Sequence, residues 1–437
     1  MKVCVQGLWH LGSVTAACLA SAGHDVIGLD QPGEALAGLM RGIPPIAEPG
    51  LQELLGAGMA AGRLRFTESA PDALGDAELL WVTYDTPVNE DDEADVQFVV
   101  DRISAALPHL RTGATVLVSS QLPVGSIRRL ESIARSLCPS GSLGFACAPE
   151  NLRLGKALDV FLHPDRIVVG VRNERDRVRI AGMLAPITDK IEWMKVESAE
   201  MTKHAINAFL ATSVVFANEI ALICEQVGAD AKDVERGLKS ESRIGPRAYL
   251  GPGGAFAGGT LARDVEFLKA VSAQRHLRSE LLHAIKASND QHKNWTRNRL
   301  GELFRPLEGR TVAVWGLTYK SGTDTLRRSL AVELCDFLIA RNVRLRVHDP
   351  EAKALPPQWE GVVARVAAPL DALAGADALV VATEWPQYRA IGGEALLGLA
   401  QDFAVLDPNR FLAHWEHLPG IRYVAVGSVP GAVGDGA

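Results

Sequence analysis

The fold is decided by the stretch VCVQGLWHLG, residues 3–12, in which an apolar run meets a glycine-bearing turn. The run Val3–Gln6 predicts a buried strand, and Gly7 and Gly12 bracket the turn that leads into a helix. A second strand follows and ends at Asp30. This order is typical of a doubly wound α/β fold, whose first strand-to-helix turn approaches the pyrophosphate of a dinucleotide.

The acidic residue at the end of the second strand favours NAD over NADP. Asp30 would bind the 2′-hydroxyl of an adenosine ribose and would repel a 2′-phosphate. Trp9 stands where the fingerprint usually has its second glycine, so either its side chain turns away or the loop binds the cofactor differently. The predicted cofactor-binding residues of this turn are Gly7, Trp9, His10, Leu11 and Gly12.

Short apolar runs alternate with helical stretches in two regions of the chain, which predicts two parallel sheets covered by helices. The predicted strands of the first region are Val3–Gln6, Asp25–Leu29, Leu79–Thr83, Thr115–Ser119 and Ile167–Gly170. Those of the second region are Thr311–Trp315, Arg344–His348, Ala378–Ala382 and Ala404–Leu406. Both regions begin like a nucleotide-binding βαβ unit.

The middle of the chain has a helical pattern. Residues 197–227 contain no Gly or Pro and are apolar on most faces, which predicts a long, largely buried helix that ends at Gly228. Helical periodicity returns over residues 261–300. We therefore expect an α/β protein with two Rossmann-like doubly wound domains joined by a central helical region. The expected boundaries are 1–196, 197–305 and 306–426, followed by a tail at 427–437.

Composition excludes several classes of protein. A hydrophobic content of 47% with 22% charged residues is ordinary for a globular chain. The formal charge of −7 argues against a general nucleic-acid binder, because no positive field would attract phosphate backbones. The six cysteines form no CxxC pair, so we expect no metal site. No apolar run approaches the ~18 residues of a membrane span, so we expect a cytoplasmic protein without membrane contact.

Motifs along roughly residues 1–425 resemble those of the UDP-glucose/GDP-mannose dehydrogenase family. The segments are Thr86-Pro87, SQLPVGS at 120–126, PENLRLG at 149–155, AEMTKHAINAF at 199–209, Arg243-Ile244-Gly245, GGAFAGGTLARD at 253–264, GLTYK at 316–320 and TDTLRRS at 323–329. The resemblance implies further cofactor contacts at Thr86, Pro87, Gln121 and Arg327. It implies substrate contacts at Asn151, Leu152, Arg153, Arg243, Phe256, Gly258 and Lys320. The implied substrate is a nucleotide sugar, the implied cofactor is NAD, and the implied assembly is a homodimer.

The candidate catalytic group centres on two residues of the long helix. Lys203 and Asn207 lie four residues apart, so they share a helix face, and a cation beside an amide can stabilise an oxyanion at a sugar carbon. The family resemblance adds Asp264, Thr260 and Glu150 to this group.

The sequence departs from the family pattern where an acid would be formed. The family's nucleophilic Cys falls on Thr260, a far poorer nucleophile, and a family Glu falls on Leu154. A family Thr falls on Gln121, and the Pro and Lys of the glycine loop fall on Ala262 and Arg263. Hydride transfer to NAD needs no thiol, whereas a thioester route does.

Three functions remain open from the sequence. The first is an NAD-dependent 6-dehydrogenase that forms a uronic acid without covalent catalysis. The second is a two-electron dehydrogenase or a hydride-shuttling epimerase that stops at an aldehyde or ketone. The third is a non-catalytic nucleotide-sugar-binding protein. The retained Lys203, Asn207 and Asp264 favour an enzyme, because a pure binder has little need of an oxyanion site.

Overall fold

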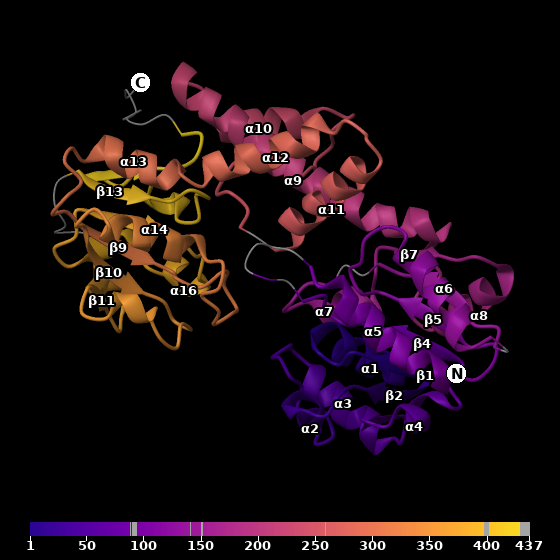
Figure 1. Ribbon diagram of the computed structural model, residues 1–437. Coiled ribbons are helices and arrows are strands. Elements are labelled where there is room, and N and C mark those ends of the chain that lie inside the picture. Colours follow the sequence, from indigo (N-terminus) through magenta and orange to yellow (C-terminus); the bar gives the residue numbers. More distant parts are fainter. Residues whose placement is uncertain are drawn as a thin grey trace. The chain divides into compact units, whose positions relative to one another are not determined.

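The chain folds into two compact units, Met1–Ile206 and Asn207–Ala437. The computed structural model describes residues 1–87, 89, 94–139, 141–149, 152–257, 259–396 and 402–428. Figure 1 colours the first unit from indigo to magenta and the second from pink to yellow. Three predicted site residues, Glu150, Asn151 and Gly258, lie outside the described residues.

The first unit is built on a sheet with the strand order β3-β2-β1-β4-β5-β6-β7-β8. Its strands are β1 Lys2–Gln6, β2 Asp25–Leu29, β3 Leu64–Thr67, β4 Leu79–Val82, β5 Thr115–Val118, β6 Gly144–Cys147, β7 Ile167–Gly170 and β8 Ile191–Met194. Neighbouring strands are parallel except β6 and β7, which are antiparallel. The predicted parallel sheet is therefore confirmed for β1 to β6 and wrong at this one pair.

Helices cover both faces of this sheet. Its helical segments are α1 His10–Ser21, α2 Glu34–Leu39, α3 Leu51–Ala60, α4 Ala70–Leu74, α5 Val96–Ala106, η1 Leu107–His109, α6 Ser126–Leu137, α7 Ala157–Leu162 and α8 Glu174–Leu184. Val3 and Val5 belong to one apolar core, whereas Cys4 between them belongs to a second core. Because successive strand residues point to opposite faces, both faces are buried, as the continuous apolar runs of the strands predict.

The second unit carries a six-stranded, all-parallel sheet with the order β11-β10-β9-β12-β13-β14. Its strands are β9 Thr311–Trp315, β10 Arg344–His348, β11 Val363–Arg365, β12 Ala378–Val381, β13 Phe403–Leu406 and β14 Ile421–Val424. The helical segments around it are α14 Leu330–Ile339, η2 Pro357–Trp359, α15 Pro369–Leu373, α16 Pro386–Arg389, η3 Gly393–Leu396 and η4 Ala413–Trp415. This strand order is the same as the order β3-β2-β1-β4-β5-β6 in the first sheet. The prediction that both α/β regions begin with a similar βαβ unit is therefore confirmed.

Five helices follow one another between the two sheets in the sequence. They are α9 Val196–Val227, α10 Ala231–Ser240, α11 Thr260–Gln274, α12 Glu280–His292 and α13 Trp295–Leu303. Gly228 follows α9 with a φ of +78°, a left-handed conformation that favours glycine and ends the helix as predicted.

The expected burial of α9 is wrong for the single chain. Phe209, Phe216 and Ile223 recur every seven residues with exposed fractions of 69%, 45% and 57%. The expectation that no segment could span a membrane is also wrong here, because α9 is long and apolar enough by composition, with a mean hydropathy of 1.7 over 18 residues. One such helix is weak evidence for a membrane protein, because a helix covered by other protein surfaces has the same composition.

Candidate active site

The turn after β1 is too tight to accept a side chain at either glycine. Gly7 has a φ of +96°. A Cβ on Gly7 would lie 2.7 Å from the backbone nitrogen of Tyr84, and a Cβ on Gly12 would lie 1.9 Å from the carbonyl oxygen of Gly7. Helix α1, which is described throughout, has no acidic residue in its first turn and no side-chain cap. Its positive end therefore suits the pyrophosphate of NAD.

Asp30 and Trp9 also fit this cofactor. The Asp30 carboxylate accepts hydrogen bonds from the backbone N–H of Leu8 at 2.6 Å and of Gln31 at 2.8 Å, so it stands at the rim of the turn. The Trp9 side chain is 48% exposed and its φ is −82°, a value that needs no glycine. The side chain therefore turns outward, and the missing second glycine does not distort the turn.

A buried glutamate ties the cofactor turn to the segment after β6. Glu48 accepts hydrogen bonds from the backbone N–H of Gly155 and of Ala157, both at 2.8 Å. Its Oε2 also lies 2.9 Å from Nε2 of His10, the first residue of α1. The predicted substrate residues Leu152 and Arg153 precede this anchor, and Leu152 packs against the core. Glu48 was not predicted as a site residue, because it lies in no motif and in no periodic stretch of the sequence.

The start of α9 holds the loop after β5. Glu200 accepts hydrogen bonds from the backbone N–H of Gly125 at 2.8 Å and of Ile127 at 2.9 Å, at the beginning of α6. Burial raises the pKa of Glu200, and these two bonds oppose that rise. Gln121 of the same loop accepts a hydrogen bond at its carbonyl from Thr86 Oγ1 at 2.6 Å. The structure thus brings together the predicted cofactor residues Thr86 and Gln121, with Pro87 adjacent.

Two predicted catalytic residues meet in the second unit. Asn207 donates a short hydrogen bond from Nδ2 to the Asp264 carboxylate, and the exposed fractions of these residues are 6% and 0%. Lys203 precedes Asn207 by one turn of the continuous helix α9, so both side chains leave the helix on the same side. Thr260 is the exposed first residue of α11, one turn before Asp264.

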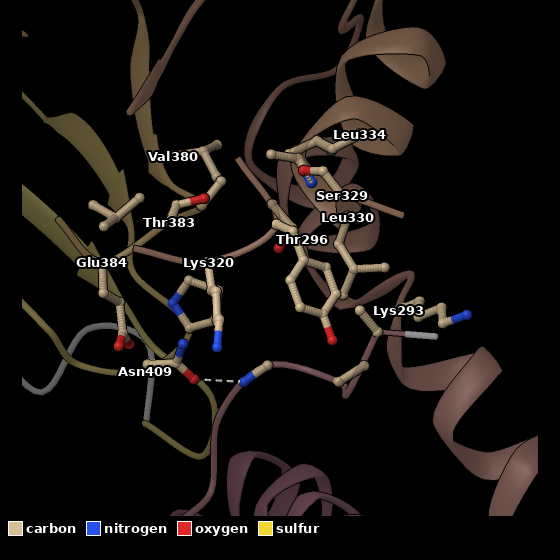
Figure 2. Close-up of a pocket in the computed structure, with 18 of the residues that line it drawn as sticks. Lys293, Thr296, Lys320, Ser329, Leu330, Leu334, Val380, Thr383, Glu384 and Asn409 are labelled. Atoms are coloured by element: carbon tan, nitrogen blue, oxygen red, sulfur yellow. Dashed lines mark hydrogen bonds between the residues drawn. The ribbon is translucent and has the colours of Figure 1, made fainter. Parts of the chain in front are cut away.

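A cavity of about 410 Å³ opens in the second unit. It lies at the carboxyl ends of β9, β12 and β13, where doubly wound sheets bind their ligands. Residues that line it include Phe256, Lys320, Thr383, Glu384 and Asn409. Figure 2 shows Lys320, Glu384 and Asn409 gathered on the side of the sheet. Two predicted substrate residues, Phe256 and Lys320, therefore share one cavity.

The glycine loop that carries Phe256 is braced by side chains that the sequence analysis missed. Asn289 accepts a hydrogen bond from the Phe256 N–H at 3.0 Å and donates one to the Phe256 carbonyl at 2.8 Å. Asn218 accepts a hydrogen bond from the Gly253 N–H at 2.9 Å, and Nε2 of His292 lies 2.8 Å from the Gly253 carbonyl. Burial lowers the pKa of His292, which favours a neutral donor. One sequence signal could have indicated Asn218. It lies eleven residues, or about three helical turns, after Asn207 on the same apolar helix, so both amides share one helix face.

Three predicted arginines are exposed within their own units. Arg243 is on the surface with its side chain 86% exposed, and it pairs with Glu241 at 3.0 Å. Arg327 is exposed and does not line the cavity. Arg153 is likewise exposed in the first unit. Within the second unit, neither Arg243 nor Arg327 lines the cavity.

Comparison with known proteins agrees with this arrangement. Three parts of the UDP-glucose/GDP-mannose dehydrogenase family match the chain in order: the NAD binding domain over residues 1–188, the central domain over 197–291 and the UDP binding domain over 313–414. The match to the NAD binding domain includes the turn after β1. The match to the UDP binding domain includes most of the residues that line the cavity.

Three relatives extend over nearly the whole chain. A UDP-glucose 6-dehydrogenase of Pseudomonas aeruginosa is 37% identical over 433 residues, which cover 94% of each sequence. A UDP-glucose 6-dehydrogenase of Bacillus subtilis is 32% identical over 437 residues, with 98% of each sequence covered. The solved structure of a UDP-glucose dehydrogenase from Pyrobaculum islandicum matches with a TM-score of 0.85 at 30% identity, with 98% of each chain covered.

These matches confirm the family resemblance, the fold class and the NAD cofactor that the sequence predicts. They favour an enzyme over the third alternative, a binding protein without catalytic activity, since the relatives are dehydrogenases. The chain belongs to the UDP-glucose/GDP-mannose dehydrogenase family and is an NAD-dependent nucleotide-sugar dehydrogenase.

Proposed function

We propose that this enzyme oxidises C6 of the glucose unit of UDP-glucose. The observation that carries the proposed chemistry is the buried hydrogen bond of Asn207 with Asp264, where Asn207 lies one helical turn after Lys203 on α9. A carboxylate with no exposed surface is costly unless its hydrogen bonds repay the loss of water, so its retention points to a role in the chemistry. The two UDP-glucose 6-dehydrogenases among the relatives support the choice of sugar.

Each side chain of the candidate site has a different role in the oxidation of the C6 alcohol to an aldehyde. Bound NAD supplies the acceptor for the hydride that leaves C6. Lys203 stabilises the negative charge that develops on the alcohol oxygen as its proton passes to a bound water, and Asn207 donates to the same oxygen. The Asp264 carboxylate fixes the orientation of the Asn207 amide. Lys320, in the cavity, balances the charge of the diphosphate.

One observation favours a reaction that pauses after the first hydride. Thr260 occupies the position of the family's Cys, and a hydroxyl does not form the thiohemiacetal from which a second hydride would leave. Leu154 occupies the position of a family Glu and cannot move a proton. The second candidate is therefore a two-electron dehydrogenase that releases an aldehyde.

A panel of nucleotide sugars tests the choice of substrate. The enzyme is incubated with NAD and each of UDP-glucose, UDP-N-acetylhexosamines, GDP-mannose and ADP-glucose, and the product masses are read. We expect NADH and an oxidised product with UDP-glucose. Turnover of a different sugar with none of UDP-glucose would contradict the proposal.

Cofactor preference should depend on Asp30. In Asp30→Asn the acceptor for the Leu8 N–H is kept, but the negative charge beside the ribose is lost. We expect the ratio of NADP to NAD dissociation constants to fall by about tenfold, the effect of one charge-assisted hydrogen bond. Calorimetric titration with each dinucleotide measures this ratio. An unchanged ratio would remove Asp30 from the cofactor site.

We also propose that the enzyme is a cytoplasmic homodimer paired through α9. Phe209, Phe216 and Ile223 form an exposed apolar row with the seven-residue spacing of a helix pair, and a second copy of α9 would cover it. Sedimentation at micromolar concentration should give a dimer. Phe216→Glu should give monomers, because it places a charge in the row. A monomeric wild-type protein would refute the pairing.

A further inference from the structure

The glycine loop at residues 253–257 lies against the turn that follows β13. The N–H of Gly254 donates a hydrogen bond to Oδ1 of Asn409 at 2.7 Å (Figure 2). A Cβ on Gly253 would lie 2.2 Å from the same oxygen. The close approach of Asn409 therefore requires a glycine at position 253, and it fixes the loop to the edge of the sheet.

The turn that carries Asn409 has two further features. The Asn409 amide lies near the carboxyl group of Glu384, which follows β12 and lines the cavity (Figure 2). Burial raises the pKa of Glu384, and the nearby Asn409 amide opposes the rise. The next residue, Arg410, has a φ of +53° and donates to Asp230 at 2.8 Å. The ion pair of Arg410 with Asp230 therefore anchors the turn after β13 at the residue next to Asn409.

The same loop is anchored from the helices. Asn218 on α9 binds the Gly253 N–H, and His292 at the end of α12 binds the Gly253 carbonyl. The loop therefore bridges the helices and the sheet, and Asn409 supplies the contact from the sheet. From this loop the chain continues to Thr260 and Asp264 at the start of α11.

We propose that Asn409 is a positioning residue that couples the nucleotide cavity to the placement of the glycine loop. Glu384 and Asn409 line the cavity, so the side chain that holds Gly254 stands at the wall of the proposed nucleotide site. Through this bond the sheet sets the position of the loop and of the residues that follow it. The inference rests on the proposed function where it is tested by kcat with UDP-glucose. Where it is tested by hydrogen exchange of the Gly254 amide, it rests only on the hydrogen bond to Asn409.

Two variants of the full chain separate positioning from direct nucleotide contact. Asn409→Ala removes the acceptor for Gly254, whereas Asn409→Asp keeps an acceptor oxygen of the same size. In Asn409→Ala we expect the Gly254 amide to exchange with solvent about tenfold faster, the effect of one lost hydrogen bond. We expect kcat with UDP-glucose to fall by about tenfold or more, because a loop displaced by a fraction of an ångström misplaces the chemistry.

The affinity for UDP alone is the discriminating measurement. If Asn409 acts by positioning, calorimetry should find the UDP dissociation constant of Asn409→Ala within about threefold of wild type. Asn409→Asp should restore slow exchange, because it keeps an acceptor oxygen for the Gly254 N–H. A loss of UDP affinity equal to the loss in kcat/KM would overturn the proposal and make Asn409 a nucleotide contact. Unchanged exchange in Asn409→Ala would overturn it as well.

The experiments give a different result if the proposed function, and not the positioning role of Asn409, is wrong. A wild-type enzyme that forms no NADH with UDP-glucose contradicts the substrate assignment. The exchange of Gly254 needs no turnover, so the comparison of the two variants still decides whether Asn409 holds the loop. A melting temperature recorded for each variant identifies any variant that fails to fold, and Asn409→Asp then carries the test.

Discussion

Replacing Lys203 with alanine is expected to lower the turnover of UDP-glucose by about 10²-fold or more, the usual cost of losing one strong oxyanion donor. Lys203 shares its helix face with Asn207, whose amide is oriented by the buried Asp264. The KM for UDP-glucose should change little, because the charge that Lys203 stabilises develops in the transition state. Steady-state kinetics with saturating NAD measures both constants.

A matched control separates this effect from damage to the helix. Lys195 is exposed and directly precedes α9, so Lys195→Ala removes a lysine from the same region without touching the candidate site. Its turnover should match wild type. The melting temperature of Lys203→Ala should change little, because a half-buried cation contributes little net stability. Wild-type turnover in Lys203→Ala would end the assignment of Lys203 to the chemical step.

The second large effect concerns the position of the missing thiol. Thr260→Cys should form a covalent adduct with the oxidised sugar that wild type does not form, because a thiolate attacks an aldehyde far more readily than a hydroxyl does. Thr260 is exposed at the start of α11, so a thiol there is accessible. The thiohemiacetal that forms first would lose a hydride to a second NAD, and the resulting thioester should persist, since Leu154 supplies no carboxylate for its hydrolysis. Intact-protein mass spectrometry after incubation with NAD and UDP-glucose measures it.

Two results would count against this view of Thr260. One is an adduct on Thr260 in the wild-type protein, which would mean that the hydroxyl is activated after all. The other is a Thr260→Cys enzyme that releases acid rapidly, which would mean that hydrolysis does not depend on a carboxylate at Leu154.

Much of the fold could be predicted because its signals are local. Ile167–Gly170, Thr311–Trp315 and Arg344–His348 are strands with the predicted bounds, since each is an apolar run between turn residues. The strand at Gly144–Cys147 was missed because it begins with a glycine. A Cβ on Gly144 would lie 2.2 Å from the Asp176 carboxylate, so a contact distant in sequence dictates that glycine.

The antiparallel pairing of β6 and β7 and the exposure of α9 have the same kind of cause. No local pattern specifies which neighbour a short buried strand selects. Helix α9 is apolar on faces that the single chain leaves exposed, so its composition reflects a surface that one chain does not supply. Sequence reasoning therefore identified the elements more reliably than their partners.

Some residues of the candidate site could likewise be predicted from the sequence, and others could not. Asn207 and Asp264, which the family resemblance assigns to one catalytic group, lie 57 positions apart and are joined by a hydrogen bond that no sequence pattern specifies. Glu48, Asn289 and Asn409 could not be found, because an amide or carboxylate that binds backbone groups has no sequence signature. The placement of Arg243 on the surface also needed the structure, since a basic residue in a short motif looks the same whether it is exposed or lines a cavity.

The number of NADH molecules formed per UDP-glucose consumed tests the central claim most directly. The enzyme is given a limiting amount of UDP-glucose with excess NAD, and NADH is followed by absorbance while a hydrazine traps any aldehyde. The account predicts one NADH per UDP-glucose in the rapid phase and a trapped aldehyde, because Thr260 and Leu154 do not support a covalent second oxidation. Two rapid NADH per UDP-glucose, with full conversion to a uronic acid, would contradict it.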